Sequence, residues 1–360
     1  MLFLVDLPKP VHGMSTINSL VLDQVQSQNI RCHTINTVPS YAAKLFNTPL
    51  WLPLKILHTL VCLLRLIAYG IVHPRCLVYR SVNGGIGQLF DIFYFSICCC
   101  FGMKLYIHHH SFSYLNRYSG LFRLINRIAG SNAVHIVLGE DMKDKLVALY
   151  HIDHRQIRVQ SNLAFFSEQA HPGAATQTDR LVIGHLANLT FDKGLDTFVE
   201  VCYALAARNI PFEAHIAGPV SDPNVKAVIH KAQADLEQVS YIGPLYGTDK
   251  DQFYQKLDAF IFPTKYVNEA EPLVLYEAAH HGALLIGTQR GCMKKVIASL
   301  GGYSLSESPS LSEAIADILS ESHTRQVFSA SDRQHRAKRF FSTLNHSRQS
   351  LNNLITEFSS

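Results

Sequence analysis

Short apolar runs alternate with helical patterns along nearly the whole chain. In the segment 194–208, apolar residues such as Leu195, Phe198, Val199 and Cys202 recur at the spacing of one helix face. The runs that predict strands cover residues 1–7, 29–35, 76–82, 104–110, 134–139, 157–162, 180–187, 212–218, 239–243, 259–264, 284–288 and 302–306. Strands that alternate with helices predict parallel, doubly wound sheets, so the expected fold class is α/β.

The chain length predicts two domains. At 360 residues the chain is longer than one hydrophobic core usually serves. The stretch 167–180 is rich in small and polar residues and contains Pro172 and Gly173, so it is the best linker candidate. We predict an N-terminal domain at 1–170, a C-terminal domain at 171–338 and a last amphipathic helix at 339–360, with packing against the N-terminal domain as one option.

The composition narrows the class of protein. Hydrophobic residues make up 48% of the chain and charged residues 17%, which is typical of a folded globular protein. The formal net charge is +4 and the basic residues are scattered, so we expect no nucleic-acid partner. The eight Cys residues form no C-x-x-C pair, which argues against a zinc ribbon or redox motif and fits a reducing cytoplasm.

The most apolar segment covers residues 56–71. Lys55 and Arg75 flank it and Arg65 interrupts it, whereas a spanning helix needs about 20 consecutive apolar residues, so we expect it not to cross a membrane. The first interpretation is a buried amphipathic helix, and the second is a helix on a bilayer surface. The N-terminus reaches Asp6 without a basic region, so no signal peptide is predicted. The expected location is the cytoplasm, with peripheral contact to the inner membrane face through 56–71 as an option.

Three carboxylates stand beside an otherwise apolar run in "NEAEPLVLYEAAHHGALLIGT", residues 268–288. Acidic residues are almost never fully buried without a partner. Pro272 suits the first position of a helix and Gly282 the residue after its end, so Glu269 and Glu271 precede a helix N-terminus, which is suited to phosphate. Because an ionised carboxylate only accepts hydrogen bonds, sugar or ribose hydroxyls are the expected partners of these acids.

The spacing of Glu269 and Glu277 resembles the E-x7-E signature of family-4 retaining glycosyltransferases, the glycosyltransferase group 1 type. "IGHLANLTFDKGLDTFVE" resembles that family's segment ending in Lys-Gly before a helix, here Lys193 and Gly194. "PKPVHGMS" resembles its first Gly-containing loop, and three further segments follow in its usual order: "HIAGP" at 215–219, "YIGPL" at 241–245 and "DAFIFPT" at 258–264. The resemblance is strong from 180 to 300 and weaker before. It implies the GT-B fold, in which two Rossmann-like domains face each other across a cleft.

The resemblance also implies roles for matching positions in the second half. Glu277 would hydrogen-bond the ribose of a sugar nucleotide, and Glu269 would lie near the donor sugar. Lys193 would neutralise the diphosphate as a point charge. The backbone of Ala270, Glu271, Pro272 and Leu273 would cradle sugar and phosphate, with the Glu271 side chain a bystander or a lesser sugar contact.

Two positions depart from the family pattern. His185 stands where the family usually carries an Arg that makes a second diphosphate contact, and Asn188 or a backbone N–H is the alternative for that contact. Lys295 stands where the family often has a Glu.

Three consecutive histidines end a predicted strand of the first half, at the strand end where ligands bind in α/β sheets. His108, His109 and His110 alternate between the faces of the strand, so they cannot converge on one metal, and no metal site is predicted. By resemblance, His110 matches the family's active-site histidine, with His109 as the second choice. Gly13, in the loop after the first strand, would let the backbone approach a ligand closely.

The implied function is retaining transfer of a sugar from a UDP- or GDP-linked donor to an acceptor hydroxyl, in the synthesis of a cell-surface polysaccharide or glycolipid. The acceptor would be a carbohydrate or lipid-linked, and no obligatory cofactor is expected. One alternative is a sugar-nucleotide epimerase of the same fold, which would turn over its donor without an acceptor. The other is a binding subunit, in which His185 and Lys295 mark lost catalysis and the donor binds without turnover.

Overall fold

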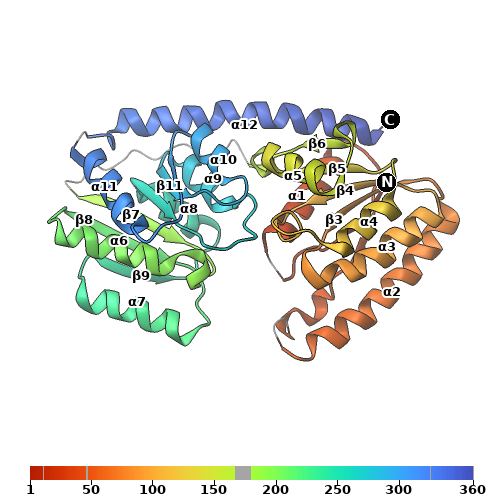
Figure 1. The fold of residues 1–360 in the computed structure, drawn as a ribbon, viewed down its shortest axis with the longest axis horizontal. Coiled ribbons are helices and arrows are strands. Elements are labelled where there is room, and N and C mark those ends of the chain that lie inside the picture. Colours follow the sequence, from red (N-terminus) through yellow and green to blue (C-terminus); the bar gives the residue numbers. More distant parts are fainter. Residues whose placement is uncertain (11, 46–47, 167–179, 325, 360) are drawn as a thin grey trace. The chain divides into compact units, whose positions relative to one another are not determined.

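The computed structural model describes residues 1–10, 12–45, 48–166, 180–324 and 326–359. The chain divides into two compact units: unit 1 comprises Met1–Phe165 with Ser347–Ser360, and unit 2 comprises Phe166–His346. Each unit contains one six-stranded sheet with helices on its faces (Figure 1). The predicted linker, 167–180, lies outside the described residues except for Arg180.

Unit 1 is built on a parallel sheet with the strand order β2-β1-β3-β4-β5-β6. Its strands are β1 (Leu2–Val5), β2 (His33–Asn36), β3 (Leu77–Val82), β4 (Lys104–His109), β5 (Val134–Val137) and β6 (Ile157–Val159). Its helices are α1 (Gly13–Ser27), α2 (Trp51–Val72), α3 (Gln88–Cys100), α4 (Gly120–Ala129) and α5 (Glu140–Tyr150), with the 3₁₀ turns η1 (Ser40–Leu45), η2 (Gly85–Gly87), η3 (His154–Gln156) and η4 (Asn162–Phe165).

Unit 2 repeats this plan with the order β12-β11-β10-β7-β8-β9, again parallel. Its strands are β7 (Leu181–Leu186), β8 (Phe212–Ala217), β9 (Val239–Gly243), β10 (Ala259–Phe262), β11 (Leu284–Thr288) and β12 (Tyr303–Leu305). Its helices are α6 (Leu195–Ala207), α7 (Pro223–Asp235), α8 (Gly247–Lys256), α9 (Leu273–His280), α10 (Met293–Ser299) and α11 (Leu311–Thr324), and η5 (Phe191–Lys193) precedes α6.

The central strands form because they are apolar on both faces. All residues of β1, β7, β10 and β11 are buried, which is the pattern of a parallel sheet covered by helices on both sides. Local signals set where helices begin: Ser119 accepts a hydrogen bond from the Phe122 N–H at the start of α4, and Asp222 accepts one from Asn224 with Pro223 in the first turn of α7. All twelve predicted strands are present, and the predicted α/β class is confirmed.

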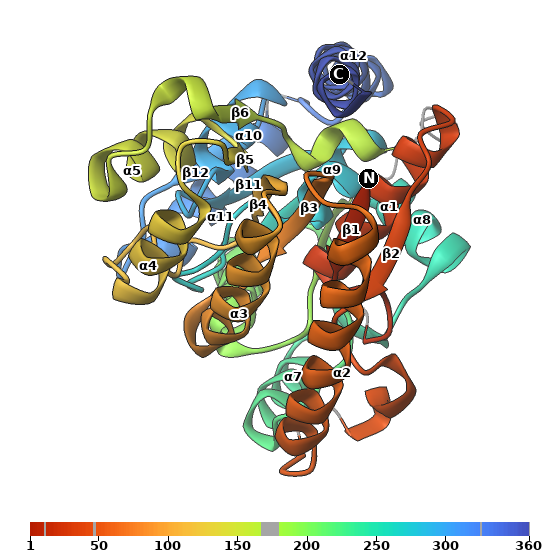
Figure 2. The same cartoon turned by 90° about the vertical axis from the view of Figure 1, so that its right-hand side faces the viewer.

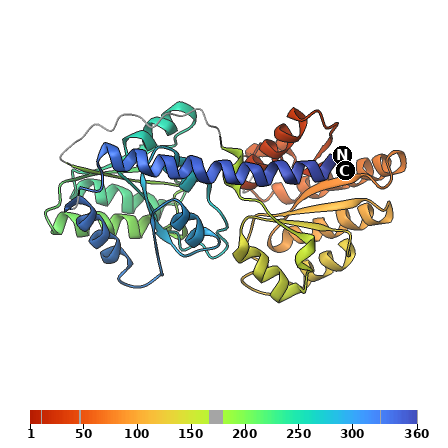
Figure 3. The same cartoon turned by 90° about the horizontal axis from the view of Figure 1, so that it is seen from above.

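The last helix, α12 (Ala330–Ser359), is longer than the predicted 339–360 segment and is continuous (Figure 3). It begins earlier because it has partners in unit 2: Arg333 and Arg336 donate to the carbonyls of His281 and Gly282, just after the end of α9. From Ser347 onward the helix belongs to unit 1, where Glu357 pairs with Arg158 at 2.7 Å.

Helix α2 contradicts the first interpretation of the apolar segment, a buried helix. Only 22% of its most apolar 18-residue window is buried. By length and composition it could cross a membrane, and it is the one helix of this kind among the described residues. Figure 2 shows α2, α3 and α4 as neighbouring helices on one face of the unit 1 sheet, and α3 packs against both of the others.

Candidate functional site

The strand order places a topological switch point in unit 2 between β7 and β10. β7 pairs with β8 on one side and with β10 on the other, so the chain leaves these neighbouring strands in opposite directions. In open α/β sheets, ligands bind outside the carboxyl ends of the strands at such a point. Lys193 lies in η5, after β7, and Glu269 lies in the connection after β10.

Lys193 and Glu269 form an ion pair at this switch point, with 2.6 Å between Nζ and Oε2. Glu269 is only 9% exposed and also accepts a hydrogen bond from the Thr264 hydroxyl at 3.4 Å. The Lys193 ammonium lies 4.8 Å from the centre of the Tyr266 ring, a cation–π distance. These contacts fix a positive and a negative group side by side at the end of the sheet.

Hydrogen bonds and an ion pair join the loop after β7, which carries Lys193, to the loop after β10, which carries Glu269. The Lys265 N–H and the Thr264 hydroxyl both donate to the Asp192 carbonyl, at 2.8 and 3.2 Å. The Lys265 ammonium pairs with Asp196 at 2.7 Å. Gly194 has a positive φ of 82°, and a Cβ at this position would lie 2.2 Å from the Pro263 carbonyl oxygen. Only glycine therefore allows the loops that carry Lys193 and Glu269 to approach so closely.

We expect Gly194→Ala to destabilise unit 2 by about 2 kcal/mol or more, because a left-handed backbone alone costs 1–2 kcal/mol in a non-glycine residue and the new Cβ would also clash. Gly120→Ala is the matched control, since no atom lies within 4 Å of its Cβ position. Thermal unfolding should show a lower midpoint for Gly194→Ala alone. Equal midpoints for the two variants would contradict the close approach.

The predicted helix after the acids is α9, with Pro272 as its N-cap and no side-chain cap. The cap residue gives the first N–H groups no side-chain partner, and the Leu275 N–H donates to the Pro272 carbonyl at 3.3 Å. The N–H groups before Leu275 lie at a helix end of the kind that is suited to anions. Ala270 is buried, and its carbonyl accepts from the Cys292 N–H at 2.9 Å, which anchors the segment before the helix. Glu271 is also buried and accepts a hydrogen bond from the Tyr276 hydroxyl at 2.5 Å, so its side chain serves the local structure.

Glu277 lies in the second turn of α9 and faces the neighbouring helix α8. Its carboxylate accepts from the Lys250 ammonium at 2.6 Å and from the Tyr254 hydroxyl at 2.9 Å. The side chain keeps 23% of its surface exposed. Each carboxylate oxygen can accept a second hydrogen bond, so Glu277 can still receive ligand hydroxyls while both protein partners orient it.

His185 lies in the core of unit 2. Its ring is fully buried, stacks between Phe198 and Phe262, and binds the Ile261 carbonyl through Nδ1 at 2.9 Å. Burial lowers the pKa of His185 to about 4, against the effect of that hydrogen bond, so the ring is neutral near pH 7. A neutral core side chain is poorly suited to the diphosphate contact predicted for it. Asn188, exposed in the bend after β7, keeps the alternative role.

The histidines of unit 1 alternate as the sequence predicted. His108 binds the Tyr79 hydroxyl at 2.5 Å, and its ring lies 4.0 Å from that of His110, centre to centre. His109 points to the other face, where it contacts Tyr114 and His135. Burial lowers the pKa of His110 to about 3, so the predicted active-site histidine is neutral at physiological pH. No cluster of three or more metal-ligating side chains occurs in the described part of the chain.

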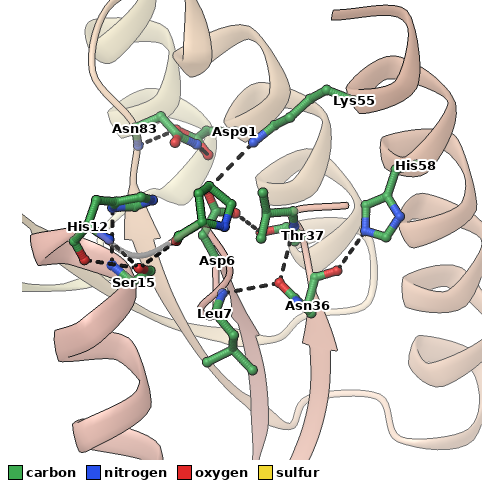
Figure 4. Close-up of polar contacts among 12 residues, drawn as sticks. Asp6, Leu7, His12, Ser15, Asn36, Thr37, Lys55, His58, Asn83 and Asp91 are labelled. Carbon is green, nitrogen blue, oxygen red and sulfur yellow. Dashed lines mark hydrogen bonds and ion pairs between the residues drawn. The ribbon is translucent and has the colours of Figure 1, made fainter. Parts of the chain in front are cut away.

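Unit 1 has its own switch point, between β1 and β3, and a polar network lies there (Figure 4). Asp6, just after β1, accepts a hydrogen bond from Thr37 and lies 3.6 Å from the Lys55 ammonium of α2. Although burial acts in the opposite direction, Lys55 and Arg80 hold the pKa of Asp6 below its ordinary value. Close by, His12 caps α1 through a reciprocal pair of hydrogen bonds with Ser15.

The same network contains a fully buried ion pair. Arg80 of β3 binds Asp91 of α3 through Nε at 2.9 Å and through Nη2, and it also donates to the Leu4 carbonyl at 3.0 Å. Asp91 accepts in addition from the Asn83 backbone N–H at 2.7 Å. All charges of this pair are thus hydrogen-bonded, as buried charges must be. Gly13 begins α1 nearby, and a Cβ there would meet no protein atom within 4 Å.

The sequence of unit 2 matches the model of a known protein family. Residues 166–335, nearly the whole of unit 2, match the model of the family described as glycosyl transferases group 1. This segment of the chain is similar to that family. The predicted resemblance to group 1 glycosyltransferases is thereby confirmed, and the ion pair of Lys193 and Glu269 lies within the matched segment.

Solved glycosyltransferase structures match the whole chain at low sequence identity. A glycosyltransferase from Rickettsia africae is 16% identical with a TM-score of 0.72, covering 100% of this chain and 98% of its own. The apo lipopolysaccharide outer core galactosyltransferase WaaB is 16% identical with a TM-score of 0.71, covering 99% of both chains. Anabaena HepE in complex with UDP is 14% identical with a TM-score of 0.70, also covering 99% of both. No curated protein sequence matches significantly. These likenesses confirm the predicted GT-B fold.

Several residues of the candidate site were not found from the sequence. Lys250 and Tyr254 orient Glu277 from a helix that starts 30 residues before it, and Thr264 supports Glu269. Thr264 carried a usable signal, since it lies two residues after the end of a buried strand and therefore at the ligand-binding edge. Lys295 is exposed on α10.

Proposed function

We propose that the protein transfers a sugar from a nucleotide-sugar donor, held by unit 2, to an acceptor hydroxyl. The observation that carries the proposal is the Lys193–Glu269 ion pair at the switch point of a group 1 glycosyltransferase unit. A UDP-linked donor is our first choice, because HepE has been solved with UDP, with UDP and glucose, and with UDP-glucose. A GDP-linked donor is the second.

The donor diphosphate would lie between Lys193 and the N-terminus of α9. An ammonium group has three donors, so Lys193 can bind Glu269 and a phosphate oxygen at the same time. The N–H groups of Leu273 and Val274, at the N-terminus of α9, would add a second source of positive potential. Both features act on the leaving group, where negative charge grows as the glycosidic bond to phosphate breaks.

Glu269 and Glu277 would bind the two ends of the donor through hydrogen bonds. Glu269, anchored by Lys193 and Thr264, would accept hydrogen bonds from hydroxyls of the sugar. Glu277, oriented by Lys250 and Tyr254, would accept them from the ribose. The backbone of Ala270 to Leu273 would line the space between these acids, because it joins them in the chain.

We propose retention of the anomeric configuration through attack on the same face from which the diphosphate departs. The bond between the anomeric carbon and the phosphate oxygen breaks with its electrons going to the diphosphate. The acceptor oxygen then bonds to the anomeric carbon, and its proton passes to the departing diphosphate. His110, neutral at pH 7, would lie near the sugar and offer a hydrogen bond without adding charge.

The acceptor would be a carbohydrate or lipid-linked hydroxyl bound by unit 1, in the synthesis of a cell-surface polysaccharide or glycolipid in the cytoplasm. The match to WaaB, named as a lipopolysaccharide outer core galactosyltransferase, supports this choice of acceptor class. The polar network around Asp6 supplies hydrogen-bonding groups at the corresponding edge of the unit 1 sheet.

Release of the nucleoside diphosphate tests this function. We expect UDP release from one UDP-sugar to accelerate when a lipid-linked or oligosaccharide acceptor is added, with mass spectrometry showing the sugar on the acceptor. Conversion of the donor to an isomeric sugar without acceptor would instead establish the epimerase. Saturable donor binding with no turnover, for every donor and acceptor tried, would establish the binding subunit.

A further inference from the structure

Helix α2 carries two opposite stripes. Thr59, Cys62, Leu66 and Gly70 are buried against unit 1. On the outward side, apolar residues recur at the same helical spacing and are exposed: Leu57 by 59%, Leu60 by 54%, Leu64 by 68% and Ile71 by 69%. An ordinary surface helix presents polar residues on that side, so this outer stripe is unexplained by folding alone.

The apolar surface extends onto the neighbouring helices. On α3, which packs against α2, Leu89 and Phe93 are exposed by 44% and 58%. On α4, which packs against the other side of α3, Leu124 is exposed by 43%. We call the outward face of α2, α3 and α4, made by these three side chains and the outer stripe of α2, the α2–α4 face (Figure 2).

The exposed charge in the segment that carries this face has one sign. Between residues 24 and 139 the sequence contains ten Lys or Arg residues and a single acid, Asp91. That acid is fully buried and paired with Arg80, so this stretch presents no carboxylate to solvent. Arg65 on α2 and Arg123 and Arg127 on α4 are exposed beside the apolar side chains. Exposed apolar groups interspersed with unopposed positive charge complement the surface of an anionic bilayer.

The contacts between α2 and the rest of unit 1 also limit how the helix could bind a lipid bilayer. Lys55 reaches Asp6, and the His58 ring binds the Asn36 carbonyl at 3.0 Å, both on the side of the helix that faces the sheet (Figure 4). A helix tied to its own domain along its length cannot insert across a bilayer without breaking these contacts. It can lie in the interface with its outer stripe among the acyl chains.

We infer that the α2–α4 face docks unit 1 on the surface of an anionic lipid bilayer, with α2 lying in the plane of the membrane. Docking requires neither donor nor acceptor, so it can be tested separately from sugar transfer. For the proposed lipid-linked acceptor, it would place the Asp6 network, which α2 contacts through Lys55, close to the headgroups.

Vesicle flotation of the full chain provides the test. We expect binding to vesicles of equal parts phosphatidylglycerol and phosphatidylcholine, weaker binding to phosphatidylcholine alone, and weakening by salt, because surface charge is screened. The double variant Leu60→Glu with Leu64→Glu should lose binding by on the order of tenfold or more, since it places two charges among the acyl chains. The matched control, Ile242→Glu with Tyr303→Glu, replaces residues of unit 2 that are 47% and 46% exposed, and it should bind like wild type.

A second variant set separates charge from apolar contact. Arg65→Gln with Arg123→Gln and Arg127→Gln should abolish the preference for phosphatidylglycerol while leaving the thermal midpoint unchanged. The comparison of the two vesicle types with the wild-type protein needs no variant, so a misfolded Leu60→Glu, Leu64→Glu protein would not remove the test. Donor-induced thermal shifts of that variant should persist, which keeps failure of docking distinct from failure of donor binding.

Three results would overturn the inference. The first is wild-type protein that fails to float with either vesicle type. The second is a wild-type dimer, seen by light scattering, that becomes monomeric in Leu60→Glu, Leu64→Glu while vesicle binding is unchanged, because a second copy of the chain would then cover the face. The third is retention of the expressed protein in membranes after alkaline carbonate extraction, which would mean that α2 spans the bilayer.

Discussion

Replacing Lys193 by alanine is expected to lower kcat by about 10²- to 10³-fold, the usual cost of removing one electrostatic group aimed at charge that develops in the transition state. The structure places this ammonium 2.6 Å from Glu269, at the switch point where the leaving diphosphate would lie. KM for the donor should change less than kcat, because negative charge on the diphosphate is greatest as the glycosidic bond breaks. Steady-state release of UDP in the presence of acceptor measures both constants.

The control for this prediction is Lys226→Ala, which removes an exposed lysine of α7 in the same unit. Lys193→Arg should recover only part of the activity, because a guanidinium does not replace a compact ammonium. Glu269→Gln should also have a lower kcat than wild type. The increase in activation free energy of the double variant, Lys193→Ala with Glu269→Gln, should be smaller than the sum of the two single increases, because the two residues act as a pair. Equal activity of Lys193→Ala and Lys226→Ala would refute the assigned role.

Acidification from pH 6.5 to 4 is expected to destabilise both units strongly. Burial lowers the pKa of His135 in unit 1 and of His185 in unit 2 to about 4, and it holds the pKa values of His108 and His109 well below 6.5. In the unfolded chain these rings have the ordinary value of 6.5. Between the folded and the unfolded pKa the unfolded state binds more protons than the folded state. The contribution of these neutral rings to the free energy of unfolding is therefore fully present above pH 6.5 and is lost as the pH falls.

Each fully buried ring should contribute about 3 kcal/mol to this loss, from a shift of roughly 2.5 pKa units at 1.36 kcal/mol per unit. Since whole domains are stable by only about 5–15 kcal/mol, this loss, which grows from pH 6.5 down to pH 4, should lower the thermal midpoint of both units clearly by pH 5. Calorimetry from pH 7.5 to 4.5 at constant ionic strength measures the effect. His185→Phe should flatten the pH dependence of unit 2, because a ring that does not titrate then fills the stack between Phe198 and Phe262.

His335→Gln is the matched control, since this histidine is exposed on α12 and its replacement should leave the pH dependence unchanged. The charged groups nearest His185 are Lys193 and Asp196, which act on its pKa in opposite directions and less strongly than burial. A thermal midpoint that stays constant between pH 7 and pH 5 would contradict the neutral, buried state of these rings.

The strands were predictable because their pattern depends on neighbours in sequence. Runs such as 259–264 and 284–288 are continuously apolar, as parallel strands covered on both faces must be, and short helices separate them. The start of α9 was equally local, since Pro272 can begin a helix but cannot continue one. Fold class and the approximate position of the acids followed from such signals.

The pairings within the site were beyond local reasoning. Lys193 and Glu269 are 76 residues apart, and only the strand order, with β10 beside β7, brings them together. The surroundings of His185 could not be predicted, because a polar residue at the end of a strand can point either into the core or toward a ligand, and sequence period does not separate these cases. Here the Ile261 carbonyl and two phenylalanine rings bind it on the core side.

The sequence could not decide between a buried helix and a surface helix at 56–71 for a related reason. Residues 56–71 are apolar on nearly every side, so their periodicity could not indicate which side faces the sheet or whether the other side is covered. The structure separates a buried stripe around Cys62 and Leu66 from an exposed one around Leu64. The Arg80–Asp91 pair was likewise hidden, because neither residue has a charged neighbour in sequence.

The central claim is that unit 2 holds a nucleotide sugar through Glu277 and the Lys193–Glu269 pair. The most direct measurement is a thermal-shift panel of UDP-, GDP- and ADP-sugars on wild type and Glu277→Gln. A ligand that binds only the folded state stabilises it by about 2.7 kcal/mol at a hundredfold excess over its dissociation constant. We predict a clear shift with one donor class, UDP-sugars first, and a smaller shift in Glu277→Gln. The absence of a shift with every donor, or equal shifts in both proteins, would contradict the claim.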